Sequence, residues 1–316
     1  MKKKIILIDA TNIKSGGGLV HLKSILNSHV FLKSNFIFHI IGSKKTLCNF
    51  ENFYIKKNSW FFERSFFFVF LWKLLFLNNY IYKYNFDLIF IPGGWFLFAA
   101  NTKTIIISQN FILFDKNVIN EYKYSFQYFK FLILRRLHIR SLKKSNGVIF
   151  LNDYVSKFIR NKHKIKNNYS IITHGVSDFF DNATKKTMSI NSNNDINIVY
   201  TSYLDFYKKQ NELIDEIIFL NKKGYNINLY LIGSSSYHYK KKIDNKIKKN
   251  NCIFYINYID QNELVFLYRK MHFAVLASTC ENLPITLIEY MKSKIPILCN
   301  EIEPCKEVLK DGGIYF

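Results

Sequence analysis

Apolar residues recur in short continuous runs along the first half of the chain, separated by longer segments with helical spacing. Runs such as IILI and LIFI are apolar at every position rather than at alternate ones, as expected of parallel strands buried on both faces. We predict strands at Ile5–Asp9, Phe36–Ile41, Asp87–Ile91, Thr104–Ser108, Gly147–Leu151 and Ser170–Thr173. We predict helices at Gly18–His29, Glu63–Tyr82, Ile119–Lys143 and Tyr154–Asn161.

A polar segment then interrupts this pattern. Residues 182–194, NATKKTMSINSNN, lack apolar periodicity and are typical of a linker. The alternation restarts with predicted strands at Ile196–Thr201, Ile227–Ile232, Cys252–Tyr255, Phe273–Ala277 and Ile295–Leu298. Its predicted helices are Lys208–Lys223, Tyr237–Lys249, Gln261–Lys270 and Pro284–Lys292. The chain is therefore predicted to be α/β, with two doubly wound, Rossmann-like domains, 1–181 and 195–316, that face an interdomain cleft.

The charge of the chain is strongly positive. The 45 Lys and Arg residues oppose 23 Asp and Glu, for a formal net charge of +22. Only six of the cations are Arg, which leaves 45 − 6 = 39 Lys, and this scarcity of arginine argues against nucleic acid as a partner. Two interpretations stay open: compositional drift in an AT-rich genome, or attraction to anionic lipid or an anionic acceptor.

The cysteines and the apolar segments of the chain indicate where in the cell the protein is located. Five cysteines without CxxC spacing indicate reduced thiols, and the N-terminus lacks the pattern of a signal peptide. Residues 66–77 form the most apolar stretch, but Lys73 interrupts it and a membrane span takes about 20 apolar residues. This stretch and the basic, aromatic segment 122–144 are either core helices or helices lying in a lipid headgroup layer. We expect a cytoplasmic protein, with peripheral contact at the inner face of the cell membrane left open.

The segment 278–289, STCENLPITLIE, has the strongest chemical pattern. It follows the strand-like run FAVLA, and Pro284 suits the first position of a helix. Such a helix start presents backbone N–H groups, here near Ile285 and Thr286, to an anion. Glu281 precedes the helix and Glu289 lies about one turn inside it, so the two carboxylates can address different parts of one elongated ligand.

This segment, with the following EYMKSKIPILCNEIEPCKEVLKDGGIYF, resembles the group 1 (family 4) glycosyltransferases of GT-B fold. The resemblance implies a hexosyltransferase that uses a UDP- or GDP-linked sugar and a glycan or lipid-linked acceptor, retains configuration, and serves surface polysaccharide or lipopolysaccharide biosynthesis. It implies that Glu281 is catalytic beside the transferring sugar and that Glu289 holds the donor ribose. Tyr290 and Lys294 replace the family's usual Ala and Gly. Relatives continue through crossover helices, which we expect to be missing beyond Phe316.

The resemblance implies further donor-binding residues. In the segment 201–210, TSYLDFYKKQ, it places Lys208 on the donor diphosphate, whose negative charge grows as it departs. Gly233, at the end of the strand 227–232, is assigned to the same group. Gly17 and Gly18 follow the first strand, where they would face the diphosphate across the cleft. A flexible loop is the alternative for these two glycines.

Three other residues are implied to position the sugar or the acceptor. Gln109 and Asn110 stand where many relatives carry a His, and amides bind hydroxyls without acting as acid or base. His174, in HGV, is the third. Ordinary buried loop amides and a structural histidine are the alternatives. The sequence contains no D-x-D, so we expect no metal ion and no cofactor, with Lys208 and the helix dipole in the metal's place.

Two other functions stay open. A GT-B-like nucleotide-sugar epimerase would share the fold and donor, and would epimerise the donor without an acceptor. A non-catalytic, basic sugar- or polyanion-binding protein would bind any polyanion with steep salt dependence and no preference for a nucleotide.

Overall fold

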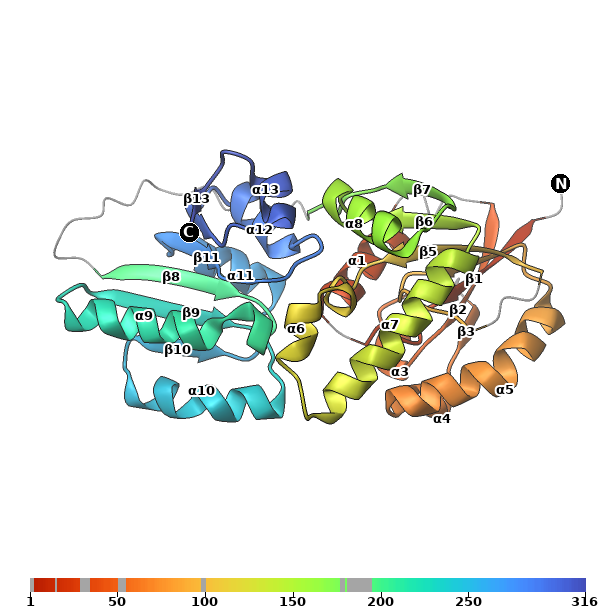
Figure 1. The fold of residues 1–316 in the computed structure, drawn as a ribbon, viewed down its shortest axis with the longest axis horizontal. Coiled ribbons are helices and arrows are strands. Elements are labelled where there is room, and N and C mark those ends of the chain that lie inside the picture. Colours follow the sequence, from red (N-terminus) through yellow and green to blue (C-terminus); the bar gives the residue numbers. More distant parts are fainter. Residues whose placement is uncertain are drawn as a thin grey trace. The chain divides into compact units, whose positions relative to one another are not determined.

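The computed structural model describes residues 3–14, 16–28, 35–50, 55–97, 101–176, 180 and 195–316. The chain divides into two compact units, Met1–Thr173 and His174–Phe316. Each unit is built on one parallel sheet, and helices join most of its successive strands (Figure 1). The predicted linker, 182–194, lies outside the described residues.

The sheet of the first unit has seven strands in the order β3-β2-β1-β4-β5-β6-β7, and all neighbours are parallel. The strands are β1 (Lys4–Asp9), β2 (Phe36–Ile41), β3 (Ile55–Lys57), β4 (Leu88–Ile91), β5 (Lys103–Ser108), β6 (Gly147–Phe150) and β7 (Asn168–Ile171). The helices are α1 (Gly16–Leu26), α3 (Lys44–Leu47), α4 (Trp60–Glu63), α5 (Phe66–Tyr84), η1 (Ile112–Phe114), α6 (Lys116–Asn120), α7 (Phe126–Lys144) and α8 (Asp153–His163).

The second sheet has six parallel strands in the order β10-β9-β8-β11-β12-β13. The strands are β8 (Ile196–Thr201), β9 (Ile227–Ile232), β10 (Ile253–Ile256), β11 (Phe273–Leu276), β12 (Ile297–Cys299) and β13 (Ile314–Tyr315). The helices are η3 (Phe206–Lys208), α9 (Gln210–Lys222), α10 (Tyr237–Lys249), α11 (Gln261–Tyr268), α12 (Ile285–Lys292) and α13 (Glu303–Leu309). None of the helices described here has the length and hydropathy that crossing a membrane requires.

Every predicted strand and helix corresponds to an observed element, but some bounds were wrong. The helix predicted at Glu63–Tyr82 is two helices, because Arg64 is extended and ends α4. The helix predicted at Ile119–Lys143 is also divided, since Tyr124 has a φ of +63° between α6 and α7. The short strands β3 and β13 and the helices α3 and α13 were not predicted.

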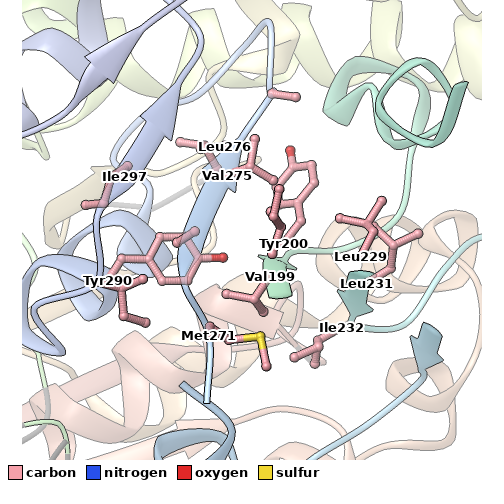
Figure 2. Packing of buried hydrophobic residues seen from close by; sticks show 14 of the residues in the cluster. Val199, Tyr200, Leu229, Leu231, Ile232, Met271, Val275, Leu276, Tyr290 and Ile297 are labelled. Atoms are coloured by element: carbon pink, nitrogen blue, oxygen red, sulfur yellow. The ribbon is translucent and has the colours of Figure 1, made fainter. Parts of the chain in front are cut away.

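The core of the second unit is formed by apolar side chains of β8, β9, β11 and α12 (Figure 2). Tyr290, which stands in the place of the family's Ala, is fully buried in it. The Tyr290 hydroxyl accepts a hydrogen bond from the Thr201 amide at 2.7 Å, and its ring centroid lies 5.3 Å from that of Tyr268. The larger residue therefore ties α12 to the end of β8. Lys294, in the place of the family's Gly, keeps the left-handed backbone with a φ of +56°.

A buried ion pair lies within the first unit. Lys73, the cation that interrupts the apolar stretch, has its Nζ 2.7 Å from Oδ2 of Asp9, and the two side chains are 0% and 2% exposed. The ammonium also lies 4.1 Å from the Trp95 ring centroid. The other Asp9 oxygen accepts a hydrogen bond from the Thr11 hydroxyl at 2.6 Å. Burial lowers the pKa of Lys73, and the Asp9 carboxylate opposes that effect. The pair fixes α5 to the end of β1.

We predict that Lys73→Met destabilises the protein by about 3–5 kcal/mol, because Asp9 stays buried without its cation. The free energy of unfolding from chemical denaturation measures this. Lys83→Met changes an exposed lysine on the same helix and should stay within about 0.5 kcal/mol of the wild type. Adding Asp9→Asn to Lys73→Met should recover part of the loss. Equal stability of Lys73→Met and Lys83→Met would contradict the described role of the ion pair.

Candidate active site

The candidate site lies at the point where the strand order of the second sheet reverses. β8 has β9 on one side and β11 on the other, so the chain leaves β8 and β11 toward opposite faces of the sheet. The segments that follow these two strands carry Lys208 and Glu281 respectively. In parallel sheets, ligands bind at this position beyond the carboxyl ends of the strands.

Lys208 and Glu281 form a hydrogen-bonded ion pair, and each side chain is only 11% exposed. Burial lowers the pKa of the Lys208 ammonium, but the Glu281 carboxylate, together with Tyr200 and Cys280, raises it, and the net effect is a raised pKa. The Tyr200 hydroxyl donates to the Lys208 carbonyl at 2.9 Å, and the Thr279 amide donates to the Tyr207 carbonyl at 2.8 Å. The first bond ties Lys208 to β8 and the second joins the two segments, so the cation and the carboxylate are fixed side by side.

The helix α12 begins beside this pair in sequence. Pro284 caps it and Ile285 is the first helical residue, which corrects by one position the prediction that Pro284 is helical. The Leu287 amide makes the bond nearest the start, to the Pro284 carbonyl at 3.0 Å. The amides of Ile285 and Thr286 precede that bond at the positive end of the helix dipole, as an anion site requires.

Glu289 is the most unusual carboxylate of this unit. Its residue is 8% exposed, and within the described part of the chain its Oε2 atom has no hydrogen-bond partner. Burial raises its pKa from 4.5 to about 7. Its charge contributes to the raised pKa values of Tyr268 and Tyr290, both dominated by burial, so these rings lie nearby. A carboxylate in this state is prepared to accept hydrogen bonds from a ligand.

Gly233 follows β9 and allows close packing of two loops. Its φ is +136°, and a Cβ atom there would lie 2.1 Å from the Ser202 carbonyl oxygen. A side chain is therefore excluded on steric and conformational grounds. The Gln210 amide donates to the Ser202 hydroxyl at 2.8 Å, which fixes the same turn from the start of α9. Gly233 thus shapes the segment after β8 that carries Lys208.

In the first unit the structure brings together two predicted residues. A Cβ atom on Gly18 would lie 3.3 Å from Oε1 of Gln109, so the start of α1 and the segment after β5 are in contact. Gly17 is exposed in the first turn of α1, and Asn110 is half-buried beside Gln109. The three glycines therefore begin the helix rather than forming a separate loop. His174 is half-buried at the start of the second unit.

Sequence reasoning missed how the site is supported. Tyr200, Tyr268 and Tyr290 are fully buried and hydrogen-bond to the backbone or side chains of this region, including the Tyr268 hydroxyl to Thr201 Oγ1 at 3.0 Å. The available signal was the position of Tyr200 near the end of β8 and of Tyr268 at the end of α11. Among the residues described in the structure, no group of three or more His, Cys, Asp or Glu is arranged to hold a metal ion.

Comparison with known proteins agrees with this geometry. Residues 182–315 match the family described as glycosyl transferases group 1. A curated relative, the serotype-specific mannosyltransferase WbdA of Escherichia coli, is 27% identical over 97 residues. That alignment covers 30% of this chain and 12% of WbdA, so the chain spans a small part of this relative's length.

Solved structures share the fold over the whole chain. HepE (Alr3699) of Anabaena, solved with UDP and glucose, has a TM-score of 0.69 at 16% identity, covering 100% of this chain and 86% of HepE. WaaG, a glycosyltransferase involved in lipopolysaccharide biosynthesis, has a TM-score of 0.65 at 12% identity, covering 99% of this chain and 85% of WaaG.

The two doubly wound sheets therefore have the fold of the GT-B glycosyltransferases, as predicted. The part of the chain that matches the group 1 glycosyltransferases, residues 182–315, includes Lys208, Glu281 and Glu289. The predicted resemblance to the group 1 glycosyltransferases is confirmed over residues 182–315.

We predict that Glu289→Gln stabilises the protein above pH 7. The raised pKa means that folding favours protonated Glu289, so this stability is present below pH 4.5 and is lost as pH rises through 7. Gln cannot ionise, so its advantage over the wild type should grow across this range to about 3 kcal/mol. Denaturant unfolding at pH 5 and pH 8 measures it. Glu263→Gln, an exposed change on α11, should show no such trend. An identical trend in both variants would contradict the assignment of the effect to Glu289.

Proposed function

We propose that this protein transfers a hexosyl group from a UDP- or GDP-linked sugar to a glycan or lipid-linked acceptor in surface polysaccharide or lipopolysaccharide biosynthesis. The observation that carries the proposal is the buried Lys208–Glu281 ion pair, together with the buried Glu289 on α12, whose Oε2 atom has no partner within the described residues. A cation for a diphosphate, a carboxylate for hydroxyls and a helix N-terminus lie on segments that meet at one switch point.

Relatives support the chemical class of donor and acceptor. HepE was solved with UDP and glucose, and WbdA is a mannosyltransferase. Both relatives therefore support a nucleotide-linked hexose as the proposed donor. WaaG acts in lipopolysaccharide biosynthesis, which supports an acceptor on a growing surface glycan or its lipid carrier. The same assignment puts the protein on the cytoplasmic side of the cell membrane, where nucleotide sugars are made.

In the proposed reaction the bond from the anomeric carbon to the diphosphate oxygen breaks, and the acceptor oxygen bonds to that carbon on the same face. The acceptor proton passes to the departing diphosphate oxygen, so configuration is retained. Lys208 then shares its charge between Glu281 and the diphosphate, and stabilises the charge that develops on the leaving group. Glu281 orients the sugar and stabilises the positive charge at its anomeric carbon.

Glu289 is proposed to accept hydrogen bonds from the donor ribose hydroxyls through the Oε2 atom that is unpartnered within the described residues. Such bonds favour the ionised carboxylate, so nucleotide binding would lower the raised pKa of Glu289. The amides of Ile285 and Thr286 would receive the diphosphate, and Gly233 allows the close packing of its own loop against Ser202 in the segment after β8. Gly17 and Gly18 are proposed to face the donor diphosphate, and Gln109, Asn110 and His174 are proposed to position the sugar or the acceptor. Metal-independent transfer is part of the proposal, with Lys208 and the α12 dipole acting on the diphosphate.

We predict that UDP or GDP raises the melting temperature, whereas ADP has less effect, in a thermal-shift screen of the nucleotides and their sugars. Glu289→Ala should abolish the shift because the ribose loses its acceptor. Glu281→Ala should retain most of the shift but lose turnover, which is followed as nucleotide released from the sugar donor. Glu263→Ala, a matched exposed change, should behave as the wild type.

Three outcomes of this screen would contradict the proposal. If Glu289→Ala and Glu281→Ala both turn over normally, the site assignment is wrong. An epimerised donor in the absence of acceptor would favour an epimerase instead. Steeply salt-dependent binding of any polyanion without preference for a nucleotide would favour the non-catalytic alternative.

A further inference from the structure

The helix α7 presents one exposed stripe that changes character along its length. The exposed side chains of the stripe are Phe126, Phe129, Ile133, Arg136, Arg140 and Lys143. The first three are apolar, with exposures of 85%, 60% and 49%, and the rest are cationic. With 3.6 residues per turn, all six positions fall within a sector of about 100°. We call these six residues the α7 stripe.

The composition of α7 differs from that of an ordinary solvated helix. Neither α7 nor α5, each 19 residues long, contains an Asp or Glu. A solvated helix gains stability from acidic residues in its first turn and from pairs of opposite charge. The helix α9 shows that this chain can supply them, since it carries Glu212, Asp215 and Glu216. The amino-acid composition of the whole chain therefore does not explain why α7 lacks acidic residues.

The distribution of arginine is also uneven. Of the six arginines in the chain, three lie on α7 and Arg64 lies between α4 and α5. Arginine is the cation that binds phosphate groups with two parallel hydrogen bonds. In a lysine-rich chain, their concentration on these elements points to phosphate groups as the ligand rather than to general solubility.

A second set of exposed aromatic residues lies next to Arg64. Trp60 and Phe67 are 55% and 64% exposed, and the Arg64 guanidinium lies 4.7 Å from the Trp60 ring centroid. We call Trp60, Arg64 and Phe67 the aromatic corner. The ammonium of Lys14 donates to the Arg64 carbonyl at 2.7 Å.

The same lysine connects the corner to α7. Burial, and then the charge of Lys14, lower the pKa of Lys130 in the second turn of α7, so the two ammonium groups are close. The aromatic corner follows β3, and Phe126 and Phe129 follow β5, so both sets lie beyond the carboxyl ends of parallel strands. Figure 1 shows α7 running from this end along the front of the first sheet. The carboxylates near these elements include Glu63, which accepts a bond from the Lys44 amide, and Asp115 and Glu121, which cap the two ends of α6.

We propose that the α7 stripe and the aromatic corner form a docking surface for a membrane with anionic phosphate headgroups. Aromatic side chains favour the boundary between headgroups and acyl chains, and cations on the same helix face bind the headgroups. A helix of 19 residues is about 28 Å long, so α7 can lie in the plane of the interface. This proposal rests on the proposed function. It places the edge of the first sheet where the strands have their carboxyl ends, and where a lipid-linked acceptor would bind, against the membrane that contains this acceptor.

The test is co-sedimentation of the full chain, without nucleotide, with vesicles of phosphatidylcholine alone or mixed with phosphatidylglycerol. We expect binding to the mixed vesicles only. Phe126→Ser/Phe129→Ser should weaken it about tenfold through lost apolar burial. Arg136→Gln/Lys143→Gln should weaken it more than tenfold, because each cation near an anionic surface contributes about fivefold. Circular dichroism and melting temperature verify that both variants are folded.

The matched control is Lys241→Gln/Lys248→Gln, which removes two exposed cations from the basic helix α10 of the second unit. It should bind as the wild type. An equal loss in this control would overturn the proposal, because charge anywhere would then suffice. So would absence of vesicle binding, or a dimer in size-exclusion chromatography that Phe126→Ser/Phe129→Ser dissociates. Because nucleotide is omitted, failure here is distinct from failure of the nucleotide screen.

Discussion

The ion pair between Lys208 and Glu281 is the interaction on which the second unit's chemistry depends. It joins the segment after β8 to the segment after β11. The strand order reverses between β8 and β11, so the chain leaves these two strands toward opposite faces of the sheet. Two charges with 11% exposure stabilise each other only while they stay in contact. An anion entering this site therefore meets a lysine that is already desolvated and oriented. The arrangement prepares a cation for a departing diphosphate without a large rearrangement.

The first unit also has an ion pair at the point where the strand order of its sheet reverses. β1 lies between β2 and β4, and Asp9 at the end of β1 pairs with Lys73 from α5. There the pair is fully buried and holds the backbone before the glycines of α1. In the second unit the pair keeps limited exposure, and the Oε2 atom of the buried Glu289 has no hydrogen-bond partner among the described residues. The difference in exposure separates a pair that holds the fold from a pair that can exchange its partner for a ligand.

The sequence allowed the strands and long helices to be predicted because continuous apolar runs and helical spacing are local properties. It did not reveal β3, whose residues Ile55–Lys57 are exposed and become a strand only by pairing with β2. The Asp9–Lys73 pair could not be predicted because its partners are distant in sequence. Lys208, Glu281 and Glu289 were predicted from local motifs, whereas the packing of Tyr268 from α11 close to Glu289 joins residues that no local motif connects.

The most direct measurement is a crystal structure of the protein with UDP bound. We predict a diphosphate oxygen within hydrogen-bonding distance of Lys208 Nζ and the first amides of α12, with a ribose hydroxyl on Glu289 Oε2. UDP bound elsewhere, with Lys208 still paired to Glu281 alone and the Glu289 carboxylate making no contact with the nucleotide, would contradict the account.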